Sequence, residues 1–395
     1  MDHFWHILFW VCLGLLIYAQ IGYLAVSAIL AAFCRRPAAS PRVDWPDVTL
    51  IIPAHNEEWV LRSKLENALA IDYPEERLEI IVASDGSSDA TIEIARQFSD
   101  RGVKLLDFDN RRGKASILND AAAAASGELL CLCDANVMFR PDALKRMVAR
   151  LDDERVGAAS GDVRLMSQES NFGEGEAFYY RIERALQSSE SRVGSMMGVD
   201  GGMYVIRREL FLPLLPDTIL DDFATTMNVI RQRRRVVYAP DAVATENGTP
   251  TARMEFKRRA RVTSGAIQIL KRGLWPPLSR PVELWQFISH KLLRWAEPVL
   301  LVALLLSNAA VWNAGLFFQI TLVTQIAFYL LGLVGTFAIK FRETRIGGIV
   351  FYFVMSHAAM VVGIVKGLFN WQPVTWARTE RTPAVEKAEK TGAPI

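Results

Sequence analysis

The sequence has few cysteines, little net charge and no glycine-rich phosphate loop. Its four cysteines among 395 residues, two of them in a C-x-C run, have no disulfide or zinc-type spacing. A net charge of +2 provides no strongly basic surface, so we expect no nucleic-acid partner. Neither G-x-G-x-x-G nor the P-loop pattern follows the first apolar strand, which argues against a dinucleotide-dependent dehydrogenase and a P-loop enzyme.

Long apolar runs, in contrast, are plentiful. Residues 4–33 contain only His6, Gln20 and Ser27 as polar interruptions and are long enough to span a bilayer. A cleaved signal peptide is the alternative, but Asp2 is the only charge before this run and the basic residues follow it. We therefore expect an uncleaved anchor with its N-terminus outside. Three further spans are predicted at residues 293–311, 316–339 and 346–365.

The loops between these spans predict their orientation. Residues 313–315 carry no charge, whereas 340–345 carry Lys340, Arg342 and Arg345, which indicates the cytoplasmic side. The central part of the chain then lies in the cytoplasm. The predicted organisation is an anchor, a cytoplasmic catalytic domain, an amphipathic helix in the interface plane, three membrane helices and a polar tail, over residues 1–36, 37–280, 281–294, 295–368 and 369–395.

The central region has an α/β pattern. Short apolar runs alternate with helical stretches, which predicts a mostly parallel sheet whose ligands bind at the carboxyl ends of the strands. The predicted strands are residues 48–52, 78–83, 103–106 and 129–133, and the helices between them are residues 57–70, 91–99 and 115–126.

Polar residues gather where these strands end. Asp134 and Asn136 follow the fourth strand with one residue between them, so a carboxylate and an amide oxygen can face one hard cation, Mg²⁺ or Mn²⁺. An ordinary turn explains the same triplet. Asp85, at the end of the second strand, can accept hydrogen bonds from a base or a ribose. Acidic strand ends without a glycine-rich loop favour a nucleoside diphosphate neutralised by a cation.

Several ordered motifs resemble those of family 2 glycosyltransferases with the GT-A fold. They are V-T-L-I-I-P-A-H-N-E-E, V-A-S-D-G-S-S-D-A-T, R-R-G-K-A-S-I-L-N-D-A, C-D-A-N, G-G-M-Y-V-I-R-R, L-D-D-F and R-R-A-R-V-T-S-G, within residues 48–270. With four predicted spans, the chain is similar to the membrane-integrated branch of the family, which includes chitin, hyaluronan, cellulose and poly-N-acetylglucosamine synthases and ceramide glucosyltransferases.

The resemblance implies a role for each matching residue. Asp222 is the expected general base, and Asp134 with Asn136 the expected metal site. The residues expected to bind the nucleotide sugar are Pro53, Glu57, Asp85, Lys114, Asp134, Arg258 and Arg261. Those expected on the acceptor side are Gly201, Gly202, Tyr204 and Asp221.

Two of these groups have plainer explanations. Asp221 and Asp222 precede a predicted helix and are suitable helix caps. Arg258, Arg259 and Arg261 precede the membrane-proximal helix, where basic residues often meet anionic lipid.

Two departures from the family pattern also bear on function. Asn136 replaces a second carboxylate, which implies a weaker or more phosphate-dependent metal site, and Val262 stands where processive synthases usually carry tryptophan.

The function expected from this pattern is a membrane-bound inverting glycosyltransferase that adds β-linked sugars from a nucleotide sugar, with UDP as the expected nucleotide, to a growing polysaccharide. The alternatives are single transfer to a lipid acceptor such as ceramide or a polyprenyl phosphate, and a non-catalytic nucleotide-binding carrier. The expected partners are the donor, a saccharide or lipid acceptor and the bilayer of a bacterial inner membrane. The oligomeric state and the side of the C-terminal tail stay open, because counting spans puts the tail outside whereas W-A-R-T-E-R resembles a cytoplasmic segment.

Overall fold

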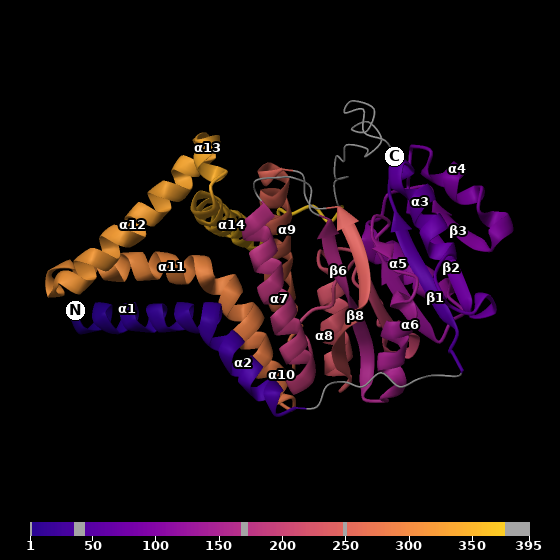
Figure 1. The fold of residues 1–395 in the computed structure, drawn as a ribbon, viewed down its shortest axis with the longest axis horizontal. Coiled ribbons are helices and arrows are strands. Elements are labelled where there is room, and N and C mark those ends of the chain that lie inside the picture. Colours follow the sequence, from indigo (N-terminus) through magenta and orange to yellow (C-terminus); the bar gives the residue numbers. More distant parts are fainter. Residues whose placement is uncertain (1, 35–43, 167–172, 248–250, 376–395) are drawn as a thin grey trace.

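The computed structural model describes residues 2–34, 44–166, 173–247 and 251–375. An α/β domain lies at one end of the molecule and long apolar helices lie at the other, with α7 and α9 between them (Figure 1). The domain is built on an eight-stranded sheet with the order β3-β2-β1-β4-β7-β6-β8-β5. Its strands are β1 Val48–Ala54, β2 Leu78–Asp85, β3 Val103–Phe108, β4 Leu129–Cys133, β5 Met138–Phe139, β6 Val156–Met166, β7 Met203–Arg207 and β8 Arg235–Asn247.

The sheet has a parallel half and an antiparallel half. Strands β3, β2, β1 and β4 are parallel neighbours, so their carboxyl ends meet at one edge. Ala54 pairs with Ser84, and Asp85 pairs with Phe108, which places the ends of β1, β2 and β3 side by side. Beyond β4, the strands β7 and β5 run antiparallel to their neighbours, while β6 and β8 are parallel to each other. The sheet is therefore mixed, with parallel pairing around the predicted strand ends.

Helices cover both faces of the sheet because residues along the strands alternate between two cores. In β1, Leu50 and Ile52 pack with α3, α4 and α6, whereas Ile51 packs with α5 and α8. The helices of the domain are α3 Glu58–Leu69, α4 Thr91–Arg96, α5 Lys114–Ala124, α6 Ala143–Val148, α7 Gly173–Val193, α8 Asp221–Arg231 and α9 Ala252–Lys271. Short 3₁₀ turns lie at Glu75–Arg77, Ser99–Arg101, Ala149–Asp152 and Arg208–Leu210.

Among the described residues, four helical stretches are long and apolar enough to cross a membrane: His3–Ala32, Pro281–Ala310, Leu316–Phe337 and Arg345–Leu368. The first consists of α1 Asp2–Ile17, the π-helical turn η1 Tyr18–Gly22 and α2 Tyr23–Ala32. The second consists of α10 Pro281–Gln286, the π-helical stretch η6 Phe287–Leu292 and α11 Leu293–Ala310. The 3₁₀ turn η7 Trp312–Ala314, α12 Leu316–Phe337, α13 Ile339–Arg342 and α14 Arg345–Leu368 follow.

The predicted interface helix is continuous with the second apolar helix. Residues 281–294 run through η6 into α11 without a break, and this stretch buries Gln286, Ser289 and His290 among protein groups. Its placement in the plane of the bilayer surface stays a prediction. Within the apolar helices, buried Glu297 accepts a hydrogen bond from Gln20 and lies 3.1 Å from the Nε2 of His357, so one carboxylate links three of the four stretches.

The last apolar helix packs directly on the α/β domain. A Cβ at Gly363 would lie 2.5 Å from the Ala260 carbonyl oxygen, and one at Gly367 would lie 2.7 Å from Ile267 Cβ. Glycine at these two positions therefore lets α14 approach α9 closely. After α14 the chain returns to the domain, where Val374 Cγ1 lies 3.4 Å from the position of a Cβ on Gly113. The described start of the tail thus lies against the domain.

Candidate functional site

Lys114 lies at the centre of the predicted site. It is the first residue of α5, and its Nζ lies 2.8 Å from Asp134 Oδ1 and 3.3 Å from Asp221 Oδ2. Burial favours the neutral amine, but the carboxylates of Asp134 and Asp221 hold the pKa of Lys114 well above its usual range. One partly buried cation therefore joins the end of β4 to the start of α8.

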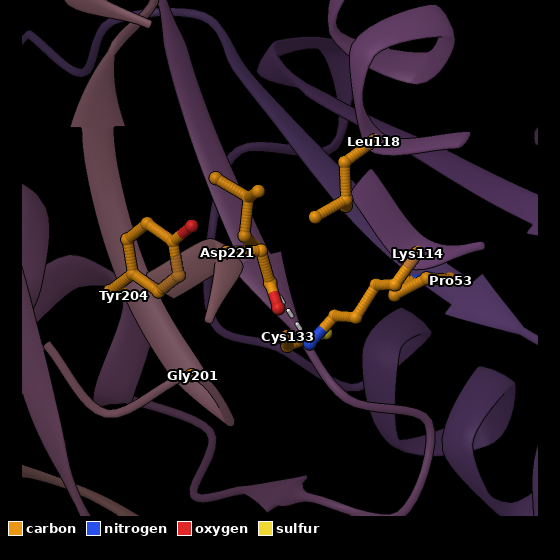
Figure 2. Close-up of a pocket in the computed structure, with 8 residues that line it drawn as sticks. Pro53, Lys114, Leu118, Cys133, Gly201, Tyr204 and Asp221 are labelled. Carbon is orange, nitrogen blue, oxygen red and sulfur yellow. Dashed lines mark ion pairs between the residues drawn. The ribbon is translucent and has the colours of Figure 1, made fainter. Parts of the chain in front are cut away.

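The neighbouring carboxylates at the start of α8 face different groups. Asp221 is 7% exposed and points toward Lys114 (Figure 2). Asp222 lies beside Gly201, because a Cβ on that glycine would be 3.0 Å from Asp222 Oδ2. The residue at the helix cap is Leu220, but Asp222 Oδ1 accepts a hydrogen bond of 2.7 Å from the Phe223 N–H, so Asp222 also satisfies one backbone donor in the first turn of α8.

The environment of Asp222 makes its carboxyl group a stronger base than an exposed aspartate. Burial, and then the charge of Asp221, raise the pKa of Asp222 to about 6, although Lys114 acts in the opposite direction. At neutral pH the group is still largely ionised. It can therefore accept a proton from a hydroxyl group placed near Gly201.

The glycine turn before β7 forms the opposite wall. A Cβ on Gly202 would lie 2.9 Å from Val137 Cγ2, so close packing requires glycine there. Tyr204 follows on β7 and is 1% exposed. Its hydroxyl group is buried and has no hydrogen-bond partner within the described ranges, and its ring lies beside Asp221 (Figure 2). Tyr204 thus contributes to the floor of the site rather than to an exposed acceptor surface.

Together these elements enclose a small pocket at the carboxyl edge of the sheet. Its lining residues are Pro53, Lys114, Leu118, Leu132, Cys133, Gly201, Tyr204 and Asp221 (Figure 2). The empty space between these side chains, including space open to solvent, is about 160 Å³. The side chains are therefore closely packed around Lys114 and Asp221.

Asp85 and Glu57 organise the turns around this pocket. The carboxylate of Asp85 is fully buried and accepts hydrogen bonds from the backbone N–H groups of Arg112 at 2.6 Å and Gly113 at 2.9 Å. These bonds position the turn that leads to Lys114. Glu57 precedes α3, and its backbone N–H donates to Thr91 Oγ1 at 2.8 Å. Contact of Asp85 with a base, and of Glu57 with a nucleotide, stay predictions.

Two acidic residues that the sequence did not single out lie near the predicted metal site. Asn136 Nδ2 donates a hydrogen bond of 2.6 Å to Glu246 Oε1 on β8. Asp200 accepts a hydrogen bond from Gly202 N–H at 3.0 Å. Burial, followed by the charges of Glu246, Asp222 and Asp134, raises the pKa of Asp200 to about 7. The V-D-G-G run would have indicated Asp200, but Glu246 is 110 residues away from Asn136 in the chain.

These carboxylates fit a divalent cation that has further oxygen ligands. Asp134 supplies a carboxylate and Asn136 an amide, and the charges of Glu246, Asp222 and Asp134 add to the effect of burial in raising the pKa of nearby Asp200. Within the parts of the chain that the structure describes, however, no three His, Cys, Asp or Glu side chains are arranged to hold an ion. The residues therefore suit a cation that also takes oxygen ligands from a bound phosphate.

The two arginines of α9 have partners on the protein. Arg258 makes a bidentate ion pair with fully buried Glu255, with distances of 2.6 and 2.9 Å. Arg261 Nη2 donates to the Ile219 carbonyl oxygen at 3.1 Å, two residues before Asp221. The Nε of Arg261 is buried and has no partner among the described residues. Arg261 thus contacts the segment that leads to Asp221, whereas Arg258 is ion-paired with Glu255.

Comparison with known proteins agrees with the family and the fold that the sequence motifs predict. Residues 49–212 match the sequence model of Glycosyl transferase family 2. Over 237 residues the chain is 27% identical to poly-beta-1,6-N-acetyl-D-glucosamine synthase of Staphylococcus epidermidis, covering 58% of this chain and 57% of that protein. Over 234 residues it is 28% identical to the probable glycosyltransferase YdaM of Bacillus subtilis, covering 56% and 55%. The matched part thus spans little more than half the length of these relatives.

A solved structure has the same fold. Mannosyltransferase PcManGT from Pyrobaculum calidifontis, in complex with GDP-Man and Mn²⁺, superposes with a TM-score of 0.67 at 24% identity, over 92% of this chain and 100% of that one. The α/β domain therefore has the GT-A fold predicted from the sequence. Residues 49–212, which carry the strand ends and Lys114, are a glycosyl transferase family 2 domain.

Proposed function

We propose that this chain is a membrane-bound inverting glycosyltransferase that transfers a sugar from a nucleotide sugar to a growing β-linked polysaccharide. The observation that carries the proposal is the position of Asp222. Its carboxylate lies beside the glycine turn and close to Asp221, which pairs with Lys114, and its pKa is raised to about 6. A base next to a cation is what a displacement at an anomeric carbon requires.

In the proposed reaction, Asp222 accepts the proton of the acceptor hydroxyl group. The hydroxyl oxygen forms a bond to the anomeric carbon from one side while the bond to the diphosphate oxygen breaks on the other. The diphosphate leaves with the bonding electrons, and the ammonium group of Lys114 stabilises the negative charge that develops. Because only one displacement takes place, the anomeric configuration inverts.

The diphosphate has a second cationic partner in this proposal. Arg261 is held near the start of α8 by its bond to Ile219, and its buried Nε is available for a phosphate oxygen. Guanidinium groups bind phosphate through parallel hydrogen bonds. Arg258 would first have to leave Glu255, so we assign it the smaller share of donor binding.

Asp134 and Asn136 would hold Mg²⁺ or Mn²⁺ on the donor side. The metal would neutralise the diphosphate and make it a better leaving group. Pro53, Glu57 and Asp85 would contact the nucleotide, with Asp85 also fixing the turn at Gly113. The proposed side of the membrane is cytoplasmic, because Lys340, Arg342 and Arg345 lie in one short loop between apolar helices.

The names of the relatives favour a polymer of N-acetylglucosamine, and we keep UDP as the nucleotide expected from the sequence. The first relative is a poly-beta-1,6-N-acetyl-D-glucosamine synthase. The second candidate is single transfer to a lipid acceptor, and Val262 favours it because valine provides no stacking surface at that position.

Product size distinguishes the two candidates. The purified full-length chain in lipid nanodiscs would be incubated with Mn²⁺ and labelled UDP-N-acetylglucosamine, UDP-glucose or GDP-mannose. We expect a long saccharide from one UDP-sugar. A product that carries one sugar on lipid would favour the second candidate, and no transfer from any donor would contradict both.

A further inference from the structure

The helical stretch 287–295 has a face that reaches the acceptor side of the site. Residues Phe287–Leu292 form a π-helical stretch between α10 and α11. Such turns are rare, and they often occur at functional sites because they redirect the side chains that follow. This stretch and the turn after it carry His290, Lys291, Arg294 and Trp295, none of which has a role in the proposed reaction.

Trp295 contacts the residue that follows the proposed base. Its ring centroid is 5.5 Å from that of Phe223 and 5.8 Å from that of Phe287. Phe223 and Phe287 are 6% and 2% exposed, and both belong to the domain core. Trp295 is only partly buried. It is therefore the least buried member of this aromatic cluster, and it contacts Phe223, the residue that follows Asp222.

Gly198 connects this cluster to the glycine turn. Its φ of +121° is one that glycine adopts readily. A Cβ at this position would lie 3.2 Å from the ring of Phe223 and 3.9 Å from Lys291 Cε. Lys291 and Phe223 thus both approach the segment that leads to Gly201. Close contacts therefore run from Gly198, three residues before Gly201, through Phe223 to the 287–295 stretch.

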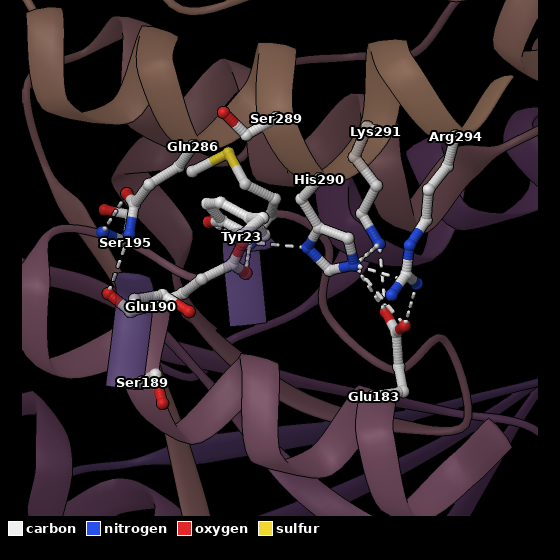
Figure 3. Close-up of polar contacts among 12 residues, drawn as sticks. Tyr23, Glu183, Ser189, Glu190, Ser195, Gln286, Ser289, His290, Lys291 and Arg294 are labelled. Atoms are coloured by element: carbon white, nitrogen blue, oxygen red, sulfur yellow. Dashed lines mark hydrogen bonds and ion pairs between the residues drawn. The ribbon is translucent and has the colours of Figure 1, made fainter. Parts of the chain in front are cut away.

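The residues that precede Trp295 in the chain belong to a polar cluster, in which His290, Lys291 and Arg294 face Glu183 (Figure 3). Glu183 on α7 accepts from Lys291 Nζ at 3.1 Å and from Arg294 Nη1 at 2.8 Å. It also lies 3.1 Å from His290 Nε2, and the other ring nitrogen of His290 lies 2.8 Å from Glu190. The side chains of Glu183, Lys291 and Arg294 are 13–19% exposed. Two cationic donors, Lys291 and Arg294, therefore lie on one carboxylate acceptor, Glu183.

This combination suits a sugar better than a lipid phosphate. The carboxylate of Glu183 lies between the two cations and would repel a phosphate group. Hydroxyl groups donate and accept, so they can bond to both kinds of side chain. A pyranose ring also has an apolar face that can pack on an indole ring.

We infer that Trp295, together with Lys291, Arg294 and Glu183, binds the acceptor saccharide by its terminal sugars and places its hydroxyl group at Asp222. Trp295 supplies the stacking surface, and the charged residues bond to the hydroxyl groups. The inference rests on the proposed transferase function and adds the acceptor class and its binding residues.

The test compares Trp295→Leu with Trp312→Leu, the same change at an exposed position in η7. Three quantities are measured on the full-length enzyme: KM for a β-linked N-acetylglucosamine oligosaccharide, KM for the donor, and donor hydrolysis without acceptor. We expect Trp295→Leu to raise the acceptor KM by about two- to tenfold, which is the loss of one stacking contact. The donor KM, donor hydrolysis and all values for Trp312→Leu should be unchanged.

If Trp295→Leu does not fold, two other variants at the same position provide the test. Trp295→Phe keeps a ring and Trp295→Met fills the space without one, so we expect the acceptor KM to stay lower in Trp295→Phe. Equal acceptor KM values in the two variants, or an unchanged KM in Trp295→Leu, would overturn the inference while leaving transfer itself established. Failure of the unmodified enzyme to transfer sugar would instead overturn the proposed function.

Discussion

Lys114 Nζ lies 2.8 Å from Asp134 Oδ1, so the first residue of α5 is joined to the residue that follows β4. Both residues are expected to bind the diphosphate end of the donor, one directly and one through a cation. In the absence of donor each charge neutralises the other. Donor binding would then replace one internal ion pair with contacts to phosphate and metal.

This arrangement predicts unequal effects at the two proposed metal ligands. Asp134→Ala removes the carboxylate, whereas Asn136→Ala removes a neutral oxygen that contributes less to binding a hard cation. We expect Asp134→Ala to abolish Mn²⁺-dependent UDP binding and Asn136→Ala to weaken it, as measured by calorimetry with and without Mn²⁺. Asp109→Ala, at an exposed position after β3, is the control. Equal losses in the two ligand variants would contradict the assignment.

The raised pKa of Asp222 predicts how transfer depends on pH. The base acts only when it is deprotonated, so kcat/KM should fall as the pH decreases through about 6. Asp221→Asn removes the negative charge next to Asp222, while Lys114 keeps its positive charge. The ionised form of Asp222 is therefore stabilised in this variant. We therefore expect the acid limb of the kcat/KM profile to move to lower pH in Asp221→Asn. A limb that stays in place would show that another group controls it.

Arg261 is expected to act through the shape of its guanidinium group. Arg261→Lys keeps the charge but loses the paired donors, so we predict a donor KM raised by about tenfold, the loss of roughly one charge-assisted hydrogen bond. Arg231→Lys is a matched control, because Arg231 also donates to a backbone carbonyl, that of Gly273. The same increase in both variants would indicate a structural role for Arg261.

The contact between α9 and α14 predicts a stability effect. At Gly363 a methyl group would lie 2.5 Å from the Ala260 carbonyl oxygen, so Gly363→Ala must separate the helices. We expect a loss of about 1–3 kcal/mol, seen as a lower Tm in detergent. Gly14→Ala in α1 is the control, since no atom lies within 4 Å of its added Cβ. If the two variants melt alike, the packing of α14 on the domain is contradicted.

Much of the site could be predicted from the sequence because its residues follow strands. Asp85 and Asp134 come directly at the ends of apolar runs, and parallel pairing brings such ends to one edge. Polar contacts between distant elements could not be predicted in this way. Glu246 reaches Asn136 only because β8 pairs with β5, which follows Asn136 by two residues. Likewise, no local pattern in the sequence predicts that the 287–295 stretch contacts α7.

One missed contact did have a local signal. Glu255 precedes Arg258 and Arg259 by three and four residues, a spacing that pairs charges on a helix. This spacing would have predicted that Arg258 is neutralised on the protein. Arg261 lies six residues from Glu255, which is consistent with its different partner, the Ile219 carbonyl oxygen.

Asp222 is the proposed base for the acceptor proton, and Asp222→Asn removes the carboxylate that would accept it. The variant and the control Asp100→Asn, at an exposed position in Ser99–Arg101, would be compared in UDP affinity and in the rate of sugar transfer. We predict a transfer rate lower by about 10²- to 10⁴-fold with unchanged UDP affinity in Asp222→Asn, and no change in the control. Transfer at the unmodified rate in Asp222→Asn would contradict the account.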